Sequence, residues 1–441
     1  MGRRKIDRRG FLEKSVKGIA GAGLALLGAE ALGGCGTLGD LRNKEEHKAN
    51  IQRAREEFIK KDIEMARESG YQVYDVGRMD FEVHSSDGIT LPTIVYYPKD
   101  KIQPSNVIIY SHGFFMGGES SRQLHEAWAR RGNVVIACDH NDWFIVDRIG
   151  NADFNIDPAV FFNKLRRSIV GDLRRGKIPK ENDLAQELFG YRQNEIDIMR
   201  EFAFQLNEYD EILRKRLNPG KMVISGLSVG GKDSIIKVRD TKHYALALAN
   251  SPATQWISDE DMANLDIPVF MVSGSNDNIG WFIRSSYEEM RSESGYMCLK
   301  NFHHFGVALD GWYNYGEGLR VLRRGRRNID KPILSGEVPA SVRADYKRPS
   351  MRGLSLGVGD AVKVFLNYRA NLEACVNNAL LVNKATSAVM SHVVDKDPSA
   401  YQRLVEVASC YEHVDQMEWL GEDLVEKVKE MRERERQMLK K

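Results

Sequence analysis

Six short apolar runs, separated by longer stretches with helical spacing, constrain the fold of this chain more than any other feature. Runs this apolar are typical of strands that are buried on both faces of a sheet. Strands that alternate with helices predict an α/β protein with a mostly parallel sheet flanked by helices. The runs cover residues 107–110, 134–138, 222–225, 244–249, 268–272 and 296–299.

The segments around these runs define the expected domain limits. Residues 71–83 and 93–97 carry strand patterns on either side of a Ser-Asp-Gly turn, so we expect a hairpin at the start of a domain that spans 71–330. The long interval 143–190 includes an Asn/Asp-rich stretch. It is interpreted as a lid insertion over the carboxyl edge of the sheet.

Both ends of the chain beyond this domain are expected to be helical. Residues 35–70 are charge-dense with helical spacing, which predicts a solvated helical linker that holds the domain off a membrane. Residues 331–441 begin with a loop rich in Pro, Gly and Ser, and helical spacing follows at 360–394 and 398–440. We therefore expect a helical C-terminal extension.

Composition and charge limit the classes of function. The chain has 441 residues, of which 42% are hydrophobic, so it can bury a core and is not disordered throughout. Its 64 Lys and Arg against 62 Asp and Glu give a formal charge of +2, which does not indicate a nucleic-acid-binding protein. The first 34 residues carry seven basic and three acidic residues, a net +4 that leaves −2 for the remainder. The positive end is therefore interpreted as a targeting segment, residues 1–34.

The N-terminus has the features of an export signal. Arg8 and Arg9 are followed by one residue and then Phe-Leu, which resembles the twin-arginine signal, and a weakly apolar stretch follows. Residues 32–35 read Leu-Gly-Gly-Cys and resemble a bacterial lipobox, in which Cys35 would be lipidated and become the mature N-terminus. We therefore expect export by the twin-arginine pathway to the periplasm or cell envelope, with a lipid anchor in the membrane.

Two other interpretations of this segment remain open. Ala-Glu-Ala at 29–31 resembles an ordinary small-residue cleavage site, and the segment could also stay uncleaved as a hydrophobic anchor. The lipobox is preferred because the cysteine directly follows the apolar stretch.

The remaining cysteines do not suggest a metal site, because the sequence has no CxxC pair and no metal-spaced His/Cys cluster. Cys138 and Cys298 lie in apolar runs, where small buried thiols are common. Cys375 and Cys410 could form a disulfide in an oxidising compartment, which the sequence alone does not decide.

A Gly-Leu-Ser-Val-Gly motif at 226–230 marks the candidate nucleophile, Ser228. It directly follows the run at 222–225 and precedes a helical pattern, the strand–turn–helix context in which G-x-S-x-G forms a nucleophile elbow. In such a turn the serine backbone is strained and small flanking residues avoid clashes. The amide of the next residue, Val229, then points to an oxyanion hole.

The pattern has a second match, at 353–357 around Ser355. No apolar strand precedes that match, so we interpret it as a loop. The alternative for the match at 226–230 is a tight structural turn without chemistry.

A serine nucleophile needs a histidine and an acid, and candidates for both follow predicted strands. Asp277 comes just after the fifth apolar run, whereas Asp266 precedes that run and falls at the other edge of the sheet. His303 and His304 follow the sixth run. Either histidine could meet Asp277 and Ser228 at the carboxyl edge.

Further stretches carry a resemblance to a known family. Residues 110–113 read Tyr-Ser-His-Gly, 128–135 read Trp-Ala-Arg-Arg-Gly-Asn-Val-Val, and 139–142 read Asp-His-Asn-Asp. With the elbow, and with Arg192 and Glu195 ahead of it, they make roughly residues 71–311 similar to the α/β-hydrolases. The similarity is to the branch of platelet-activating-factor acetylhydrolases, dienelactone hydrolases and cutinases.

The resemblance implies an α/β-hydrolase fold with a triad in the order Ser, Asp, His. It favours His304 over His303, because His-Phe-Gly at 304–306 is common in the corresponding loop of the family. It also assigns the second oxyanion donor to the amide of Phe114, which follows His-Gly and would act with the amide of Val229.

Two positions depart from the family pattern. Acetylhydrolases have their acid after the strand at 244–249, where this chain reads Asn-Ser-Pro, so Asp277 would serve instead, as in dienelactone hydrolases and cutinases. The elbow has Leu227 where relatives commonly have histidine.

We therefore expect an exported carboxylic ester hydrolase that uses Ser228, His304 and Asp277 and needs no cofactor and no metal. Apolar residues near the strand ends favour a small-molecule or lipid-like ester, although each could equally be core or lid packing. The alternatives are a non-catalytic envelope protein that binds or assembles with a partner, and a serine peptidase of the same fold. The apolar residues are Phe114, Phe115, Met116, Trp143, Phe144, Trp281 and Phe282.

Overall fold

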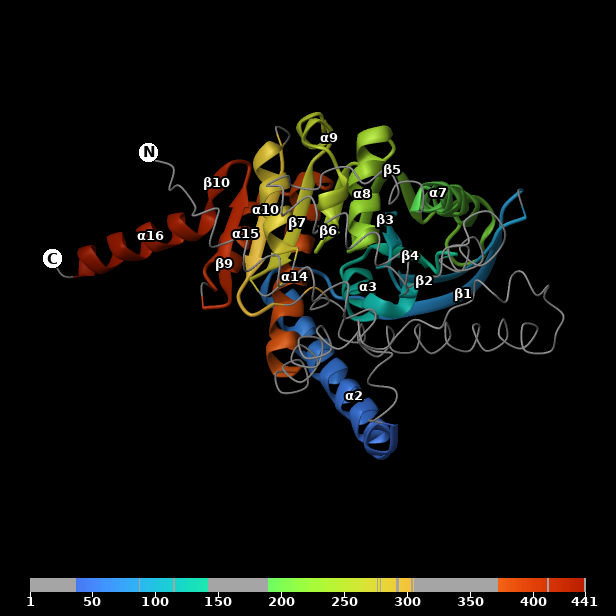
Figure 1. The fold of residues 1–441 in the computed structure, drawn as a ribbon, viewed down its shortest axis with the longest axis horizontal. Coiled ribbons are helices and arrows are strands. Elements are labelled where there is room, and N and C mark those ends of the chain that lie inside the picture. Colours follow the sequence, from blue (N-terminus) through green and yellow to red (C-terminus); the bar gives the residue numbers. More distant parts are fainter. Residues whose placement is uncertain are drawn as a thin grey trace, which may run out of the picture. The chain divides into compact units, whose positions relative to one another are not determined.

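A mixed ten-stranded sheet with helices packed on it is the centre of the structure (Figure 1). Apart from the first part of helix α2 (Thr37–Glu68), the residues that we describe belong to one compact unit, made of 49–141, 179–311 and 371–441. The second unit, 1–48, 142–178 and 312–370, is described only from 37 to 48. The computed structural model describes residues 37–439 except 87, 114–115, 142–188, 276, 278, 291–292, 303, 305–371 and 411.

The strand order of the sheet is β1-β2-β4-β3-β5-β6-β7-β8-β9-β10. The strands from β4 to β8 in this order run parallel, and the outer strands at both ends pair antiparallel. A mixed sheet flanked by helices confirms the predicted α/β class. The strands are β1 (Val76–His84), β2 (Thr90–Pro98), β3 (Ser105–Ser111), β4 (Val134–Cys138), β5 (Leu217–Leu227), β6 (Leu246–Asn250), β7 (Val269–Gly274), β8 (Gly295–Leu299), β9 (Val414–Trp419) and β10 (Glu422–Asp423).

Each of the six predicted apolar runs is a strand, from β3 to β8, and the predicted hairpin is β1 and β2. Every residue of β4, β6, β7 and β8 is buried, which is why these strands read as continuous apolar runs in the sequence. Their parallel pairing places all their carboxyl ends at one edge of the sheet.

Side chains alternate between the two faces of the sheet and build two hydrophobic cores. In β3, Ile108 and Tyr110 belong to one core, and Val107 and Ile109 belong to the other. Helices α3, α14, α15 and α16 contribute to the first core, and α7, α8, α9 and α10 to the second. The helices are α3 (Arg122–Arg130), α7 (Tyr191–Tyr209), α8 (Val229–Asp240), α9 (Asp259–Ala263), α10 (Gly280–Glu289), α14 (Leu372–Val393), α15 (Ala400–Ala408) and α16 (Leu424–Leu439).

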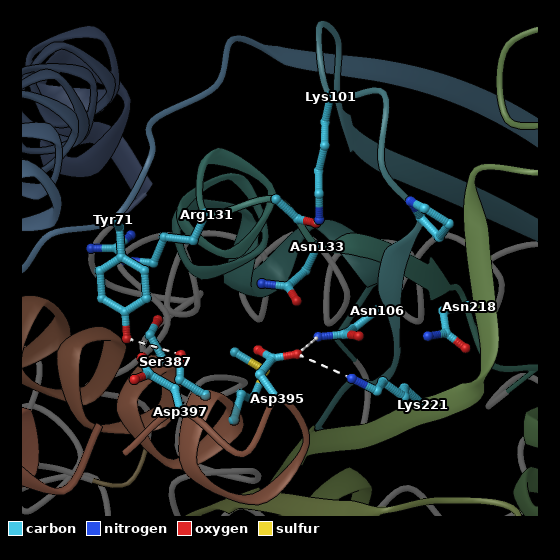
Figure 2. Close-up of a pocket in the computed structure, with 14 residues that line it drawn as sticks. Tyr71, Lys101, Asn106, Arg131, Asn133, Asn218, Lys221, Ser387, Asp395 and Asp397 are labelled. Atoms are coloured by element: carbon cyan, nitrogen blue, oxygen red, sulfur yellow. Dashed lines mark hydrogen bonds and ion pairs between the residues drawn. The ribbon is translucent and has the colours of Figure 1, made fainter. Parts of the chain in front are cut away.

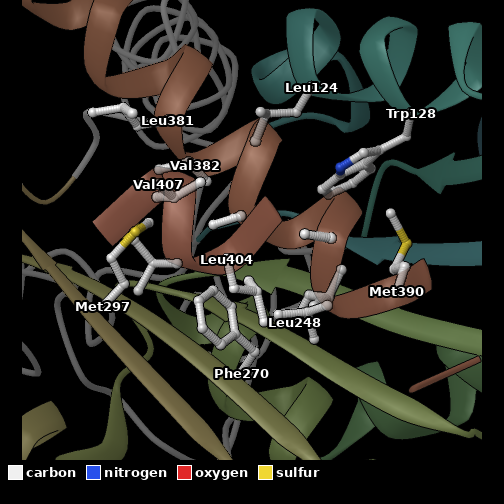
Figure 3. Packing of buried hydrophobic residues seen from close by; sticks show 14 of the residues in the cluster. Leu124, Trp128, Leu248, Phe270, Met297, Leu381, Val382, Met390, Leu404 and Val407 are labelled. Carbon is white, nitrogen blue, oxygen red and sulfur yellow. The ribbon is translucent and has the colours of Figure 1, made fainter. Parts of the chain in front are cut away.

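The C-terminal part differs from the expected helical extension. Strand β9 pairs antiparallel with β8, with Met297 opposite Met417, and extends the sheet. Val382 of α14 and Leu404 of α15 pack in the same core as Phe270 of β7 (Figure 3). The prediction of helix throughout 398–440 is therefore wrong at β9, which pairs with the free edge of β8, and at β10, which pairs with β9.

Helix α2 differs from the expected solvated linker. Ala54, Phe58, Asp62 and Ala66 recur at every fourth position and are at most 3% exposed, so they form a buried stripe. Asp62 accepts hydrogen bonds from Arg130, the last residue of α3, at 3.2 Å and from the adjacent Arg131 at 2.8 Å. It also accepts one from the Asn383 side chain of α14 at 2.5 Å. This part of α2 is thus fixed to the folded unit.

Cys138, Cys298, Cys375 and Cys410 are all free thiols, so the disulfide left open between Cys375 and Cys410 is not formed. The export signal, Cys35 and residues 142–188 of the expected lid lie outside the described residues. Within the described part of the chain, none of the helices combines the length and apolar character that a membrane span requires.

Candidate functional site

Ser228 occupies a strained turn between strand β5 and helix α8. Its backbone has φ 57° and ψ −116°, a positive-φ conformation that costs a non-glycine residue about 1–3 kcal/mol. A Cβ atom on Gly226 would lie 2.2 Å from the carbonyl oxygen of Gly230, and one on Gly230 would lie 2.0 Å from that of Ser111. Both glycines of the motif are therefore required by close backbone packing around the serine.

His304 links Ser228 to Asp277. Its Nε2 lies 2.8 Å from Ser228 Oγ, and its Nδ1 lies 3.1 and 3.3 Å from the two carboxylate oxygens of Asp277. An ionised carboxylate only accepts, so Nδ1–H donates to Asp277 and leaves Nε2 to accept the proton of the Ser228 hydroxyl. The Asp277 side chain is fully buried and that of His304 is 22% exposed. The three groups thus form a hydrogen-bonded series in which the carboxylate is buried and the imidazole is more accessible.

Hydrogen bonds in two neighbouring loops bring the acid and the base together. The N–H of Ile279 donates to Asp277 Oδ1 at 3.0 Å and fixes the carboxylate. The loop after β7 is tied to β8 because Ser275 N–H donates to the carbonyl of the last residue of β8 at 2.9 Å. Asn301 N–H in turn donates to Ser275 Oγ at 2.9 Å. These bonds hold both loops at the carboxyl edge beside Ser228.

Val229, the expected oxyanion donor next to the nucleophile, is the first residue of α8. N–H groups in the first turn of a helix have no acceptor inside the helix and carry partial positive charge, which suits a developing oxyanion beside Ser228. Phe114, the other expected donor, lies outside the described residues, as do the alternatives His303 and Ser355.

The expected apolar pocket is only partly described. Met116 and Phe282 are buried, at 7% and 3% exposure, and Met116 belongs to the first core. Phe115, Trp143 and Phe144 lie outside the described residues, and the side chain of Trp281 is not described. The preference for an apolar acyl group therefore stays a prediction.

A group of buried charges below Ser228 was not predicted as part of the site. Lys232 and Asp233 lie in the first turns of α8, and Arg192 faces them from α7. All three side chains are at most 2% exposed. The signal in the sequence was the placement of two opposite charges directly after the elbow, in the first turns of the helix that follows it.

A separate pocket lies at the opposite, amino edge of the sheet (Figure 2). It has a volume of about 330 Å³ and is lined by residues such as Asn106 near the start of β3 and Lys221 of β5. Asp395 in this pocket accepts a hydrogen bond from Asn106 at 2.9 Å and pairs with Lys221 at 3.8 Å. None of Ser228, Asp277 and His304 lines this pocket, so it is distinct from the candidate site.

Comparison of the chain with protein-family models and with curated proteins gives no match. What points to a function is therefore the site itself, above all the hydrogen-bonded series Ser228, His304 and Asp277.

Proposed function

We propose that this protein is a serine hydrolase of the α/β-hydrolase fold that cleaves a carboxylic ester through an acyl-enzyme. The observation that carries the proposal is the contact of Ser228 Oγ with His304 Nε2 at 2.8 Å, with Asp277 on the other ring nitrogen. The order Ser, Asp, His along the chain and the strained strand-to-helix turn at the serine support the fold assignment.

The proposed reaction begins with attack of Ser228 Oγ on the ester carbonyl carbon. His304 Nε2 takes the hydroxyl proton, and Asp277 stabilises the imidazolium that forms. The carbonyl oxygen becomes an oxyanion that the Val229 N–H would stabilise, a type of contact worth about 10²–10³ in rate. His304 then gives its proton to the leaving alcohol as the tetrahedral intermediate collapses to the acyl-enzyme.

Hydrolysis of the acyl-enzyme by water uses the same groups. His304 removes a proton from water, the hydroxide attacks the acyl carbon, and a second tetrahedral intermediate forms. The proton returns to Ser228 Oγ as the carboxylic acid leaves. No step calls for a cofactor or a metal ion.

Export is a separate part of the proposal and rests on the sequence alone. We propose that the twin-arginine pattern at Arg8 and Arg9 directs the protein out of the cytoplasm and that Cys35 anchors it by a lipid in the cell envelope. Palmitate labelling in a bacterial host, with and without Cys35→Ala, tests the anchor. Equal labelling of the two proteins would contradict it.

A fluorophosphonate probe tests the nucleophile, because it reacts only with an activated serine. We expect labelling of the wild-type protein, no labelling of Ser228→Ala and normal labelling of Ser355→Ala. Hydrolysis of p-nitrophenyl esters of increasing acyl length then measures the acyl preference. A folded wild-type protein that neither reacts with the probe nor cleaves any ester would refute the enzyme assignment and favour a non-catalytic binding role.

A further inference from the structure

Helix α7 places an arginine and a glutamate, three residues apart, in the interior of the protein. The exposed fraction is 0% for Arg192 and 1% for Glu195. Residues at this spacing lie on the same side of a helix. Buried charges are costly unless they are paired and hydrogen-bonded, so the partners of these two side chains show what they hold.

Arg192 joins two segments that lie on either side of the nucleophile turn. Its Nη1 donates to the carbonyl oxygen of His112 at 2.7 Å, just after β3. The same nitrogen lies 3.6 Å from Asp233 Oδ2 in α8. Asp233 is fully buried, and its other carboxylate oxygen lies 3.1 Å from Lys232 Nζ. Arg192 thus bridges the turn after β3 and the helix that follows Ser228.

The two bridged segments touch directly at the first turn of α8. A Cβ atom on Gly230 would lie 2.0 Å from the Ser111 carbonyl oxygen and 2.6 Å from that of His112. Val229, the proposed oxyanion donor, directly precedes Gly230. A shift of the 111–112 backbone would therefore move the N–H of Val229 relative to Ser228.

Glu195 fixes the same turn from its other side. It accepts from His140 Nδ1 at 2.7 Å with one oxygen and from Asn141 N–H at 3.2 Å with the other. His140 Nε2 lies 2.7 Å from Ser111 Oγ. His140 N–H donates to His112 Nε2 at 2.8 Å.

The series Ser111, His140 and Glu195 has distances like those of Ser228, His304 and Asp277, but it is not a second catalytic centre. The exposed fraction of Ser111 is 1%, and its carbonyl packs against Gly230. A nucleophile must be reachable by a substrate, whereas this serine serves as a hydrogen-bonding contact for the turn.

We propose that Arg192 is a positioning residue for the reaction proposed above, with Glu195 in a supporting role. Arg192 fixes the turn after β3 relative to the first turn of α8. It thereby positions the Val229 N–H to stabilise the oxyanion of the transition state. The inference rests on the proposed hydrolase function. A displacement of about 1 Å from the productive geometry can cost about 10²-fold in rate. An ester binds in its ground state without an oxyanion, so the loss should fall on kcat rather than on KM.

Steady-state hydrolysis of a p-nitrophenyl ester by Arg192→Met tests this inference. We expect kcat to fall about 10- to 100-fold while KM changes less than about 2-fold. Arg192→Lys keeps the charge but carries it on a shorter side chain as a compact ammonium, so it should recover only part of kcat. Arg200→Met is the matched control, since Arg200 lies on the same helix and pairs with Glu201 at its surface. It should leave both constants unchanged.

Asp233→Asn and Glu195→Gln keep the shape of the site. If Arg192→Met does not fold, a fall in kcat in these two variants tests the inference in its place. If Arg192 acts through Asp233, the double variant Arg192→Met/Asp233→Asn should lose no more kcat than Arg192→Met alone. Values of kcat within 2-fold of wild type in all the folded single variants would overturn the inference. Absence of activity and of Ser228 labelling in the wild-type protein would instead refute the proposed function, so the two failures are distinguishable.

Discussion

His125 is a buried group whose charge state should limit the stability of the protein in mild acid. The ring is fully buried among Tyr96, Tyr110 and Trp128, whose ring centroids lie 5.7, 4.2 and 6.1 Å away. Neither ring nitrogen has a hydrogen-bond partner in the described part of the chain. Burial in these apolar surroundings lowers the pKa of His125 from 6.5 to about 3.

The lowered pKa sets both the direction and the size of the effect. Below pH 6.5 the unfolded chain takes up a proton at His125, whereas the folded chain does so only near pH 3, so the free energy of unfolding falls as the pH falls. Each pH unit within this window changes that free energy by about 1.4 kcal/mol. The 1.5 units between pH 6.5 and pH 5 therefore correspond to a loss of about 2 kcal/mol.

Urea unfolding at pH 7 and pH 5, followed by circular dichroism, measures this loss. In His125→Leu the difference in unfolding free energy between the two pH values should be smaller by about 2 kcal/mol than in the wild type. Any loss of packing is the same at both pH values and cancels. His243→Leu, at an exposed position before β6, is the control. Equal losses between pH 7 and pH 5 in His125→Leu and the wild type would refute the reasoning.

Three further predictions concern the nucleophile turn, the acid and the anchoring of α2. Gly230→Ala should lower kcat by at least about 100-fold, because the new Cβ meets backbone at 2.0 Å, whereas Gly220→Ala, with its nearest contact at 3.5 Å, should be active. Asp277→Asn should lower kcat about 10³- to 10⁴-fold with the circular dichroism spectrum unchanged, and full activity would exclude it as the acid. Asp62→Ala should lower the free energy of unfolding by about 3–5 kcal/mol in urea titrations, because it removes the carboxylate that pairs with the buried side chains of Arg130 and Arg131, and Arg130 keeps only its longer contact with Glu126. A loss below about 1 kcal/mol would show that α2 is not fixed by this contact.

The central strands could be predicted from the sequence because both of their faces are buried. In β6, β7 and β8 every position is covered, so the pattern is apolar without interruption. Strand β9 is different because it lies next to the edge and exposes Asp415, so apolar and charged residues are mixed. This segment lies between two helices, and its mixed sequence has a spacing similar to theirs. It forms a strand because it pairs with the free edge of β8.

The burial of these charged residues could not be predicted from the sequence, because it depends on tertiary contacts. Asp62 falls on the apolar stripe of α2, where a charged residue reads as evidence of a solvated face. Its arginine partners are distant in the sequence, and so are the partners of Arg192. Charges that are neutralised by tertiary contacts look the same in a sequence as charges that face water. Ser228, Asp277 and the pair His303 and His304 could be proposed because each follows a recognisable strand, and the resemblance at 304–306 then favoured His304.

The turn after β6 contacts the backbone of the candidate nucleophile, Ser228. The N–H of Ser228 donates to the carbonyl of Asn250 at 2.9 Å, and the N–H of Ala253 donates to the carbonyl of Ser228 at 3.0 Å. The turn after β6 thus supports the strained serine from both of its backbone groups.

The same turn is also hydrogen-bonded to β7, the strand that precedes Asp277. Ser251 has φ 43°, and its N–H donates to the carbonyl of Val272 in β7 at 2.7 Å. The turn after β6 is therefore held by Ser228 on one side and by β7 on the other. Asp277, held by the N–H of Ile279 in the next loop, reaches the imidazole without disturbing that support.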